Sequence, residues 1–164
     1  MAKMFDASEW NEFFAKLKGP LKESLARRMA IAGARLLSAQ AKENALIADN
    51  KEGVGRRGVL AKNIYHAYDK RSPAGEFSYN VSWRRGEGGA NHGHLIEFGH
   101  WRTHAVYKAK NGEWYTRKDL PLDKPVWVAA RPFLRPAFDA NREAVIRIMI
   151  DTGRQEFPKL LEEM

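Results

Sequence analysis

Hydrophobic residues near the start of the chain recur at the spacing of an α-helix. They lie three or four positions apart and so share one helix face; they are Trp10, Phe13, Phe14 and Leu17. Asp6 can cap this helix, and Gly19 followed by Pro20 predicts its end, because glycine accepts the left-handed cap conformation and proline cannot continue the helix. The apolar face predicts either core packing or a docking arm, formed by residues 1–19, that anchors on a neighbouring subunit.

A second apolar stripe predicts a longer helix from Pro20 to about Ile47. Its apolar residues follow one another at spacings of four or three: Leu21, Leu25, Met29, Ala32 and Leu36. The many alanines of this helix allow another backbone to approach closely. The glycine-rich stretch from Gly53 to Gly58 has no clear period, which indicates a loop.

Alternation of apolar and polar residues over positions 77–83 predicts a β-strand with one apolar face. The apolar positions are Phe77, Tyr79, Val81 and Trp83. Farther along, Asn111-Gly112 lies between two strand-like arms and predicts a hairpin with a two-residue turn. That register sets Ala109 opposite Trp114, and the polar surface of the arms indicates that the hairpin protrudes.

The last third of the chain predicts a helix that begins near Pro136, because proline suits the first helical turn. Its apolar residues recur on one side and include Phe138, Val145 and Met149. The order helix, helix, strands, helix lacks a regular strand-helix alternation and predicts an α+β fold. We expect a single domain over residues 1–164, in which a small antiparallel sheet packs against the long N-terminal helix and the C-terminal helix.

The composition narrows the classes of protein to consider. A chain of 164 residues is about one domain long and can bury a core without disulfides or metal. No apolar run approaches the roughly 18 residues of a membrane span, and the start lacks a signal peptide, so we expect a cytoplasmic protein without membrane association. The absence of cysteine excludes disulfides, thiol catalysis and cysteine-bound zinc.

The formal charge of +8 indicates an acidic partner, such as nucleic acid or an acidic protein surface. The basic residues are spread along the chain and form only short pairs, unlike the longer basic runs of nucleic-acid-binding tails. Two pairs lie in glycine-rich segments and are candidate phosphate contacts: Arg56, Arg57, Arg84 and Arg85. A nucleic-acid-binding module is therefore one hypothesis for the function.

Four of the five histidines fall within "HGHLIEFGHWRTH", residues 92–104. His92 and His94 would share one face of a strand, a spacing that can bind metal, so a metal-dependent hydrolase is another hypothesis. A strand that continues to residue 99 would turn Glu97 to the opposite face and separate the ligands. No nucleophile motif or phosphate-binding loop accompanies the cluster. We therefore predict no catalytic or metal site and expect residues 95–99 to form a buried strand and turn.

Two motifs resemble a known family when they are taken together. One is an "EFG" triplet and the other is "ARPFLRPAFD", which leads into the last helix. Their residues are Glu97, Phe98, Gly99, Pro132, Phe133, Leu134, Arg135 and Pro136. With the alanine-rich basic helix and Gly58-Val59-Leu60, this combination resembles the HK97 gp10-like tail-component proteins of tailed bacteriophages over about residues 20–155.

The resemblance implies a virion structural protein with no catalysis and no cofactor. It would assemble into a ring of identical subunits as a neck, tail-completion or head-tail joining protein, made in the host cytoplasm. The expected partners are adjacent neck, connector or tail-tube proteins, and phage DNA in the channel would meet basic residues without sequence readout. A ring subunit needs two complementary patches, which the aromatic helix and the hairpin could supply.

The motifs also predict a link between the histidine-rich segment and the last helix. Glu97 can form a bidentate ion pair with Arg131 or Arg135. Such a pair would give Glu97 a structural role.

Overall fold

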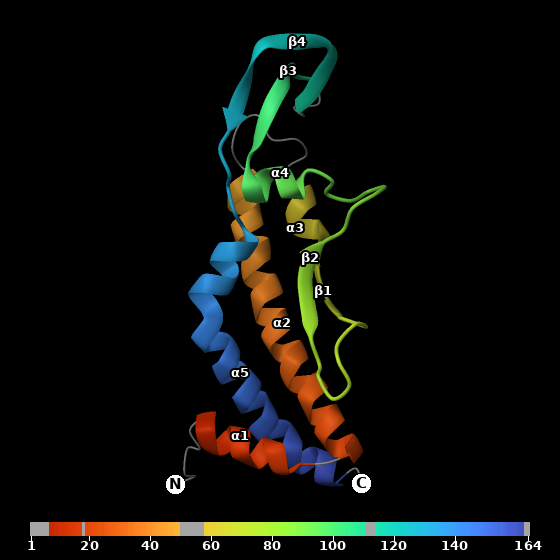
Figure 1. Ribbon diagram of the computed structural model, residues 1–164, viewed down its shortest axis with the longest axis vertical. Helices are drawn as coiled ribbons and strands as arrows, with labels where there is room; N and C mark the ends of the chain where they lie inside the picture. Colours follow the sequence, from red (N-terminus) through yellow and green to blue (C-terminus); the bar gives the residue numbers. More distant parts are fainter. Residues whose placement is uncertain (1–6, 18, 50–57, 111–113, 163–164) are drawn as a thin grey trace. The chain divides into compact units, whose positions relative to one another are not determined.

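The structure, a computed structural model, describes residues 7–17, 19–49, 58–110 and 114–162. Its α+β architecture confirms the predicted fold class (Figure 1). The helices are α1 (Ala7–Lys16), α2 (Gly19–Asp49), α3 (Val59–Asn63), α4 (Gly93–Phe98) and α5 (Leu134–Glu162). The strands form two separate two-stranded sheets, one of β1 (Ile64–Tyr68) with β2 (Tyr79–Trp83) and one of β3 (His100–Lys108) with β4 (Trp114–Val128).

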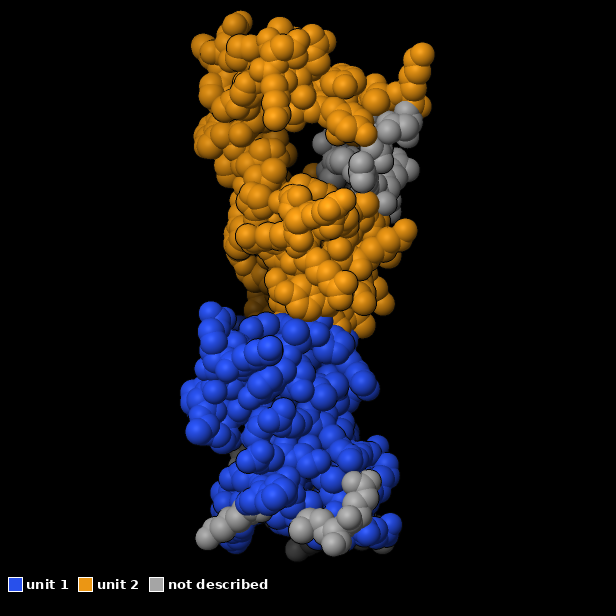
Figure 2. Space-filling view, turned by 90° about the vertical axis from the view of Figure 1, so that its right-hand side faces the viewer, with its two compact units in different colours: residues 1–36, 66–80, 141–164 blue, residues 37–65, 81–140 orange. Residues whose placement is uncertain are grey.

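The chain forms two compact units, each assembled from separate stretches of sequence (Figure 2). Unit 1 comprises residues 1–36, 66–80 and 141–164, and unit 2 comprises residues 37–65 and 81–140. The long helices α2 and α5 therefore each contribute residues to both units. The interleaving means that neither unit is a contiguous segment of the sequence.

The apolar side predicted for the first helix, α1, packs into the core of unit 1. Half-buried Phe13, Phe14 and Leu17 lie against buried Leu25, Met29 and Leu160. The ring of Phe13 meets that of Phe157 edge-on, with 5.0 Å between the centroids. Gly19 has the predicted left-handed conformation, with φ of 67°. Asp6 and the side chain of Trp10 lie outside the described part of the chain.

The core of unit 2 is centred on Phe133, which is fully buried directly before α5. Its ring meets that of Trp83 edge-on, with 5.6 Å between the centroids. Helix α2 presents a stripe of small residues to this core, which lets the other elements approach its backbone closely: Ala41, Ala45 and Ala48. The remaining buried members come from α3, β1, α4, α5 and the segment before α4: Leu60, Ala61, Ile64, Ala90, Ile96 and Ala137.

The strand predicted over residues 95–99 is wrong, because residues 93–98 form the helix α4. Its buried residues are Gly93, Ile96 and Glu97, which share one side of a helix at spacings of three and four. A Cβ atom on Gly93 would lie only 2.5 Å from Nε1 of Trp83, so the indole ring occupies the space beside this glycine. Gly99 ends the helix with φ of 73°. The HxH metal spacing therefore does not lie on a strand.

The hairpin prediction is confirmed in its antiparallel strands and wrong in its register. Trp114 pairs with Lys108, not with Ala109, so five residues connect β3 and β4 where two were expected. Asn111-Gly112 lies in the part of this connection that the structure does not describe. The register of the β3–β4 pairing shifts on both sides of His104. Strand β4 is exposed along most of its length. Within unit 2, the hairpin extends beyond α4 (Figure 1).

Helix α5 begins two residues before the predicted start and continues through Pro158. Pro136 lies in its first turn, as expected for a residue that has no backbone N–H to donate. Phe138 is half exposed, whereas Val145 and Met149, which follow it at helical spacing, are partly buried. The buried residue in this turn is Ala137.

Candidate functional site

Glu97 joins the two sequence motifs by capping the start of α5. Its side chain is only 4% exposed, and its Oε2 atom accepts hydrogen bonds from the backbone N–H groups of Phe133 at 2.8 Å and Leu134 at 3.0 Å. Its Oε1 atom accepts from the N–H of Arg135 at 3.2 Å. Because Pro136 has no N–H, the carboxylate satisfies three consecutive donors that would otherwise lack partners. A negative charge is also favourable at a helix N-terminus.

The predicted ion pair between Glu97 and an arginine is wrong. The guanidinium of Arg131 donates instead to the backbone carbonyl of Ala48, at 3.0 Å. The guanidinium of Arg135 lies over the ring of Phe98, 6.0 Å from its centroid. The sequence correctly indicated that Glu97 binds the segment that leads into α5. Its partners are backbone N–H groups and not a guanidinium, because the carboxylate lies at the N-terminal end of that helix.

The outer face of the β3–β4 hairpin carries exposed aromatic residues. Trp101 pairs across the strands with Trp127, and their ring centroids are 5.3 Å apart. Tyr107 pairs with Tyr115 in the same way at 6.0 Å. The exposed fractions are 62% for Trp101, 50% for Trp127, 46% for Tyr107 and 39% for Tyr115. A group of large exposed aromatic rings is a candidate interaction surface. We call these four residues the aromatic face.

The opposite face of the same strand borders a cavity together with α4. His100, Arg102 and Val106 alternate along β3 with the residues of the aromatic face and lie less exposed. Arg131, from the segment before α5, reaches the same cavity. Two of the cluster histidines, His92 and His100, therefore line a space whose charged residues, within the described ranges, are Arg102 and Arg131. No group of three or more His, Asp or Glu placed to hold a metal ion occurs within the described ranges.

Two ion pairs, each with an aspartate whose pKa is lowered, occur on β4 and in the turn after β1. Arg117 donates to Asp119 on β4 at 2.6 Å, which lowers the pKa of the Asp119 carboxyl to about 2 and raises that of the guanidinium. Asp69 accepts from the backbone N–H and side chain of Arg71, and these bonds lower its pKa to about 2. These pairs are on the surface, where they order the chain locally and stabilise it little.

The four candidate phosphate contacts are only partly described. Arg56 and Arg57 lie outside the described residues. Arg84 and Arg85 are exposed, and their guanidinium groups lie over the rings of Tyr65 and Trp83, at 5.8 Å and 5.3 Å from the centroids. The stacking holds this basic pair at the surface of unit 2.

Sequence analysis missed the aromatic face and the cavity arginines. A signal for the first was present only in part, because Trp101 lies between the polar residues His100 and Arg102, while Tyr107 follows the apolar Val106. Arg131 carried no local signal, since only the fold places it beside Arg102. The candidate interface residues Phe13, Phe14 and Leu17 are partly covered by the core of unit 1.

Comparisons of the chain with known protein families, curated proteins and solved structures give no significant match. Among the helices of the described ranges, none has the length and apolar character needed to cross a membrane.

Proposed function

We propose that this chain is a structural subunit of a tailed-phage virion, a ring-forming neck or tail-completion protein at the head-tail junction. The observation that carries the proposal is the aromatic face of the hairpin, which presents two cross-strand aromatic pairs to solvent. Aromatic side chains are the residues that most often dominate protein interfaces. A hairpin with such a face suits contact with a neighbouring subunit.

The motif resemblance supports the same proposal. The "EFG" and "PFLRPA" motifs lie more than thirty positions apart in sequence, and the Glu97 cap brings them into contact. Because both motifs contribute to this one helix cap, a family that keeps the cap would keep the two motifs together. The partners in this proposal are identical subunits and adjacent neck, connector or tail-tube proteins.

Subunit association is tested by light scattering and sedimentation of the purified chain and of Trp101→Ser. If the aromatic face holds subunits together, we expect association to weaken about 30-fold or more, the effect of losing an interface anchor. Leu161→Ser is the matched control, because it removes an apolar side chain of similar exposure, 51%, from another surface. A Trp101→Ser protein that assembles like the parent would contradict the proposed contact.

The place in the virion is tested by electron microscopy of phage particles made without this protein. A joining role predicts separate full heads and finished tails. Normal infectious particles would refute it.

A second candidate function, non-specific DNA contact, is favoured by the exposed and stacked pair Arg84 and Arg85. It predicts affinity for duplex DNA that falls steeply with salt, because bound phosphates release counterions. The slope of the logarithm of the binding constant against the logarithm of the salt concentration is roughly −0.9 per phosphate contact. Replacing both arginines with glutamine should therefore reduce the size of this slope by about 1 to 2. The pair Lys70 and Arg71, both exposed, is the control. An unchanged slope in the first variant would argue against this function.

A further inference from the structure

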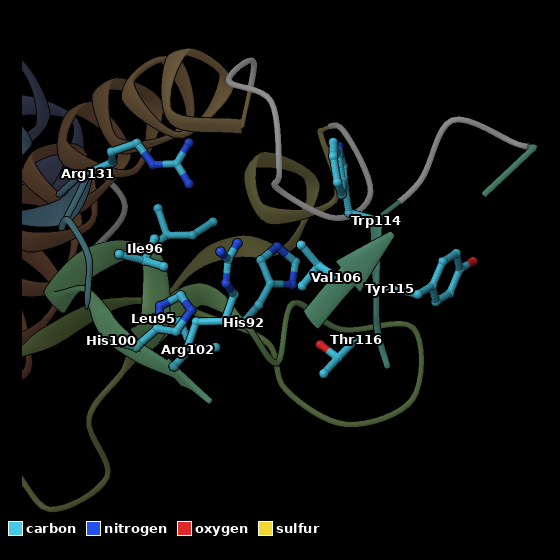
Figure 3. Close-up of a pocket in the computed structure, with 11 residues that line it drawn as sticks. His92, Leu95, Ile96, His100, Arg102, Val106, Trp114, Tyr115, Thr116 and Arg131 are labelled. Atoms are coloured by element: carbon cyan, nitrogen blue, oxygen red, sulfur yellow. The ribbon is translucent and has the colours of Figure 1, made fainter. Parts of the chain in front are cut away.

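A cavity of about 300 Å³ lies between α4 and the inner face of the β3–β4 hairpin in unit 2 (Figure 3). Its volume is at the lower end of the range for small-molecule sites. The lining comprises His92, Leu95, Ile96, His100, Arg102, Val106, Trp114, Tyr115, Thr116, Val128 and Arg131. All of these residues belong to one compact unit, so the cavity does not depend on how the two units are placed.

Among the residues that the structure describes, the charged side chains of the lining are those of Arg102 and Arg131, and the lining also includes the imidazole rings of His92 and His100. The guanidinium groups of Arg102 and Arg131 and the imidazole ring of His92 point toward a common space in Figure 3. None of the described lining residues is an aspartate or a glutamate. The nearby carboxylate of Glu97 is occupied by backbone N–H groups of α5. Two guanidinium groups that share a cavity repel each other unless an anion lies between them.

Nε of Arg102 and Nδ1 of His100 are buried atoms of the lining that have no hydrogen-bond partner in the described part of the chain. Buried polar atoms in folded proteins nearly always have a partner, so each orphan requires an explanation. An acceptor inside the cavity would provide one. Arg131, in contrast, is held in place by its bond to the carbonyl of Ala48.

The rest of the lining is apolar, which restricts the kind of anion. Leu95, Ile96, Val106 and Val128 contribute aliphatic side chains, and Trp114 contributes an indole ring. Inorganic phosphate would lose hydration against these walls without gaining donors there. A carboxylate attached to an apolar or aromatic group would satisfy both halves of the cavity. Carboxylates also match the planar fork of arginine donors.

We propose that this cavity binds a small organic carboxylate, with its carboxylate between Arg102 and Arg131 and its apolar part against Trp114 and Val106. Tyr115 belongs to both the lining and the aromatic face, but the four residues that hold the ligand in this proposal do not belong to the aromatic face, so the proposal does not depend on assembly through that face. It adds a ligand site to a protein for which the motif resemblance implies none.

The test is titration calorimetry of the full chain with benzoate, benzamide and inorganic phosphate. We expect one benzoate to bind per chain, with benzamide at least about tenfold weaker because it lacks the charge that strengthens hydrogen bonds to arginine. Phosphate should also bind more weakly than benzoate. Equal affinity for benzamide would overturn the role of the carboxylate, and equal or higher affinity for phosphate would overturn the role of the apolar walls.

A variant links the binding to the cavity. Arg102→Met keeps a long apolar side chain and removes the guanidinium, so benzoate affinity should fall at least about tenfold. Arg117→Gln is the matched control, because it removes an arginine from the same hairpin outside the cavity. Circular dichroism checks that both variants fold. Equal benzoate affinity in parent and Arg102→Met would overturn the proposal.

A second measurement uses the parent protein and remains informative if Arg102→Met does not fold. Nuclear magnetic resonance should show that the ring signals of His100 move as benzoate is added, while those of His66, on β1 in unit 1, do not. Unchanged His100 signals up to about 10 mM benzoate, where even a weak ligand would occupy the site, would overturn the proposal.

Discussion

Replacing Glu97 with glutamine should weaken the cap at the start of α5, within unit 2. The substitution keeps the size of the side chain and removes its charge. In the parent, one carboxylate accepts hydrogen bonds from the N–H groups of Phe133, Leu134 and Arg135. Glutamine offers one acceptor oxygen and one NH₂ group. In its best orientation, the glutamine oxygen accepts hydrogen bonds from the N–H groups of Phe133 and Leu134. Its NH₂ group then faces the N–H of Arg135, and two donors cannot bind each other.

The magnitude follows from these three bonds. A hydrogen bond to a charged acceptor contributes about 1.5–3 kcal/mol and a neutral one about 0.5–1.5, so each of the two retained bonds weakens by about 1 kcal/mol. The N–H of Arg135 loses its partner, which costs about 1–3 kcal/mol when the group is buried. Because this donor is only partly buried and the helix can relax, we expect the free energy of unfolding to fall by about 3 kcal/mol.

Urea denaturation followed by circular dichroism measures this loss, with the free energy of unfolding extrapolated linearly to water. Glu87→Gln is the control, because it makes the same chemical change at an exposed position in the loop before α4 and should alter stability by less than about 0.5 kcal/mol. A loss below about 1 kcal/mol for Glu97→Gln would refute the idea that the carboxylate anchors the helix.

Two further substitutions test other features of the fold. Gly99→Ala should lower the free energy of unfolding by at least about 3 kcal/mol in urea denaturation, since φ is 73° and a Cβ atom would lie 2.8 Å from a backbone oxygen. Gly86→Ala, with φ of 90° and open space around it, should lose only about 1–2 kcal/mol; equal losses would show that the clash is absent. Hydrogen bonds from Lys159 and Arg28 lower the pKa of Glu156 below 4.5. Stability from these bonds is therefore present above the unfolded pKa and lost as pH falls through the lower folded value. Thermal melts from pH 6 to 2 should show a smaller acid loss for Glu156→Gln, and parallel curves would contradict this assignment.

Features set by short-range patterns were predictable from the sequence. The aromatic spacing of α1 and the left-handed Gly19 depend on residues within a turn or two of each other. The alternation that defines β2 is similarly local, and it correctly placed Trp83 on an apolar face. The order of these elements along the chain then sufficed for the α+β class. In each case the determining contacts lie close together in sequence.

Residues 93–98 show where local pattern stops being informative. Six residues are too few to distinguish helical from strand periodicity, since an apolar run of this length suits both. Helix α4 forms because its two ends have distant partners: the indole ring of Trp83 lies against Gly93, and the carboxylate of Glu97 receives the amides of α5. Neither partner is adjacent in the chain.

The histidine cluster changes its meaning for the same reason. Its sequence suggested metal ligation or a surface group, but the fold turns His100 and Arg102 toward a cavity that Arg131 also reaches. Sequence by itself determined the helices α1, α2 and α5, the alternation of β2 and the identity of the acid in the "EFG" motif. Only the tertiary structure decided which amides that acid binds and which cations face each other, because both depend on contacts between segments about thirty residues apart.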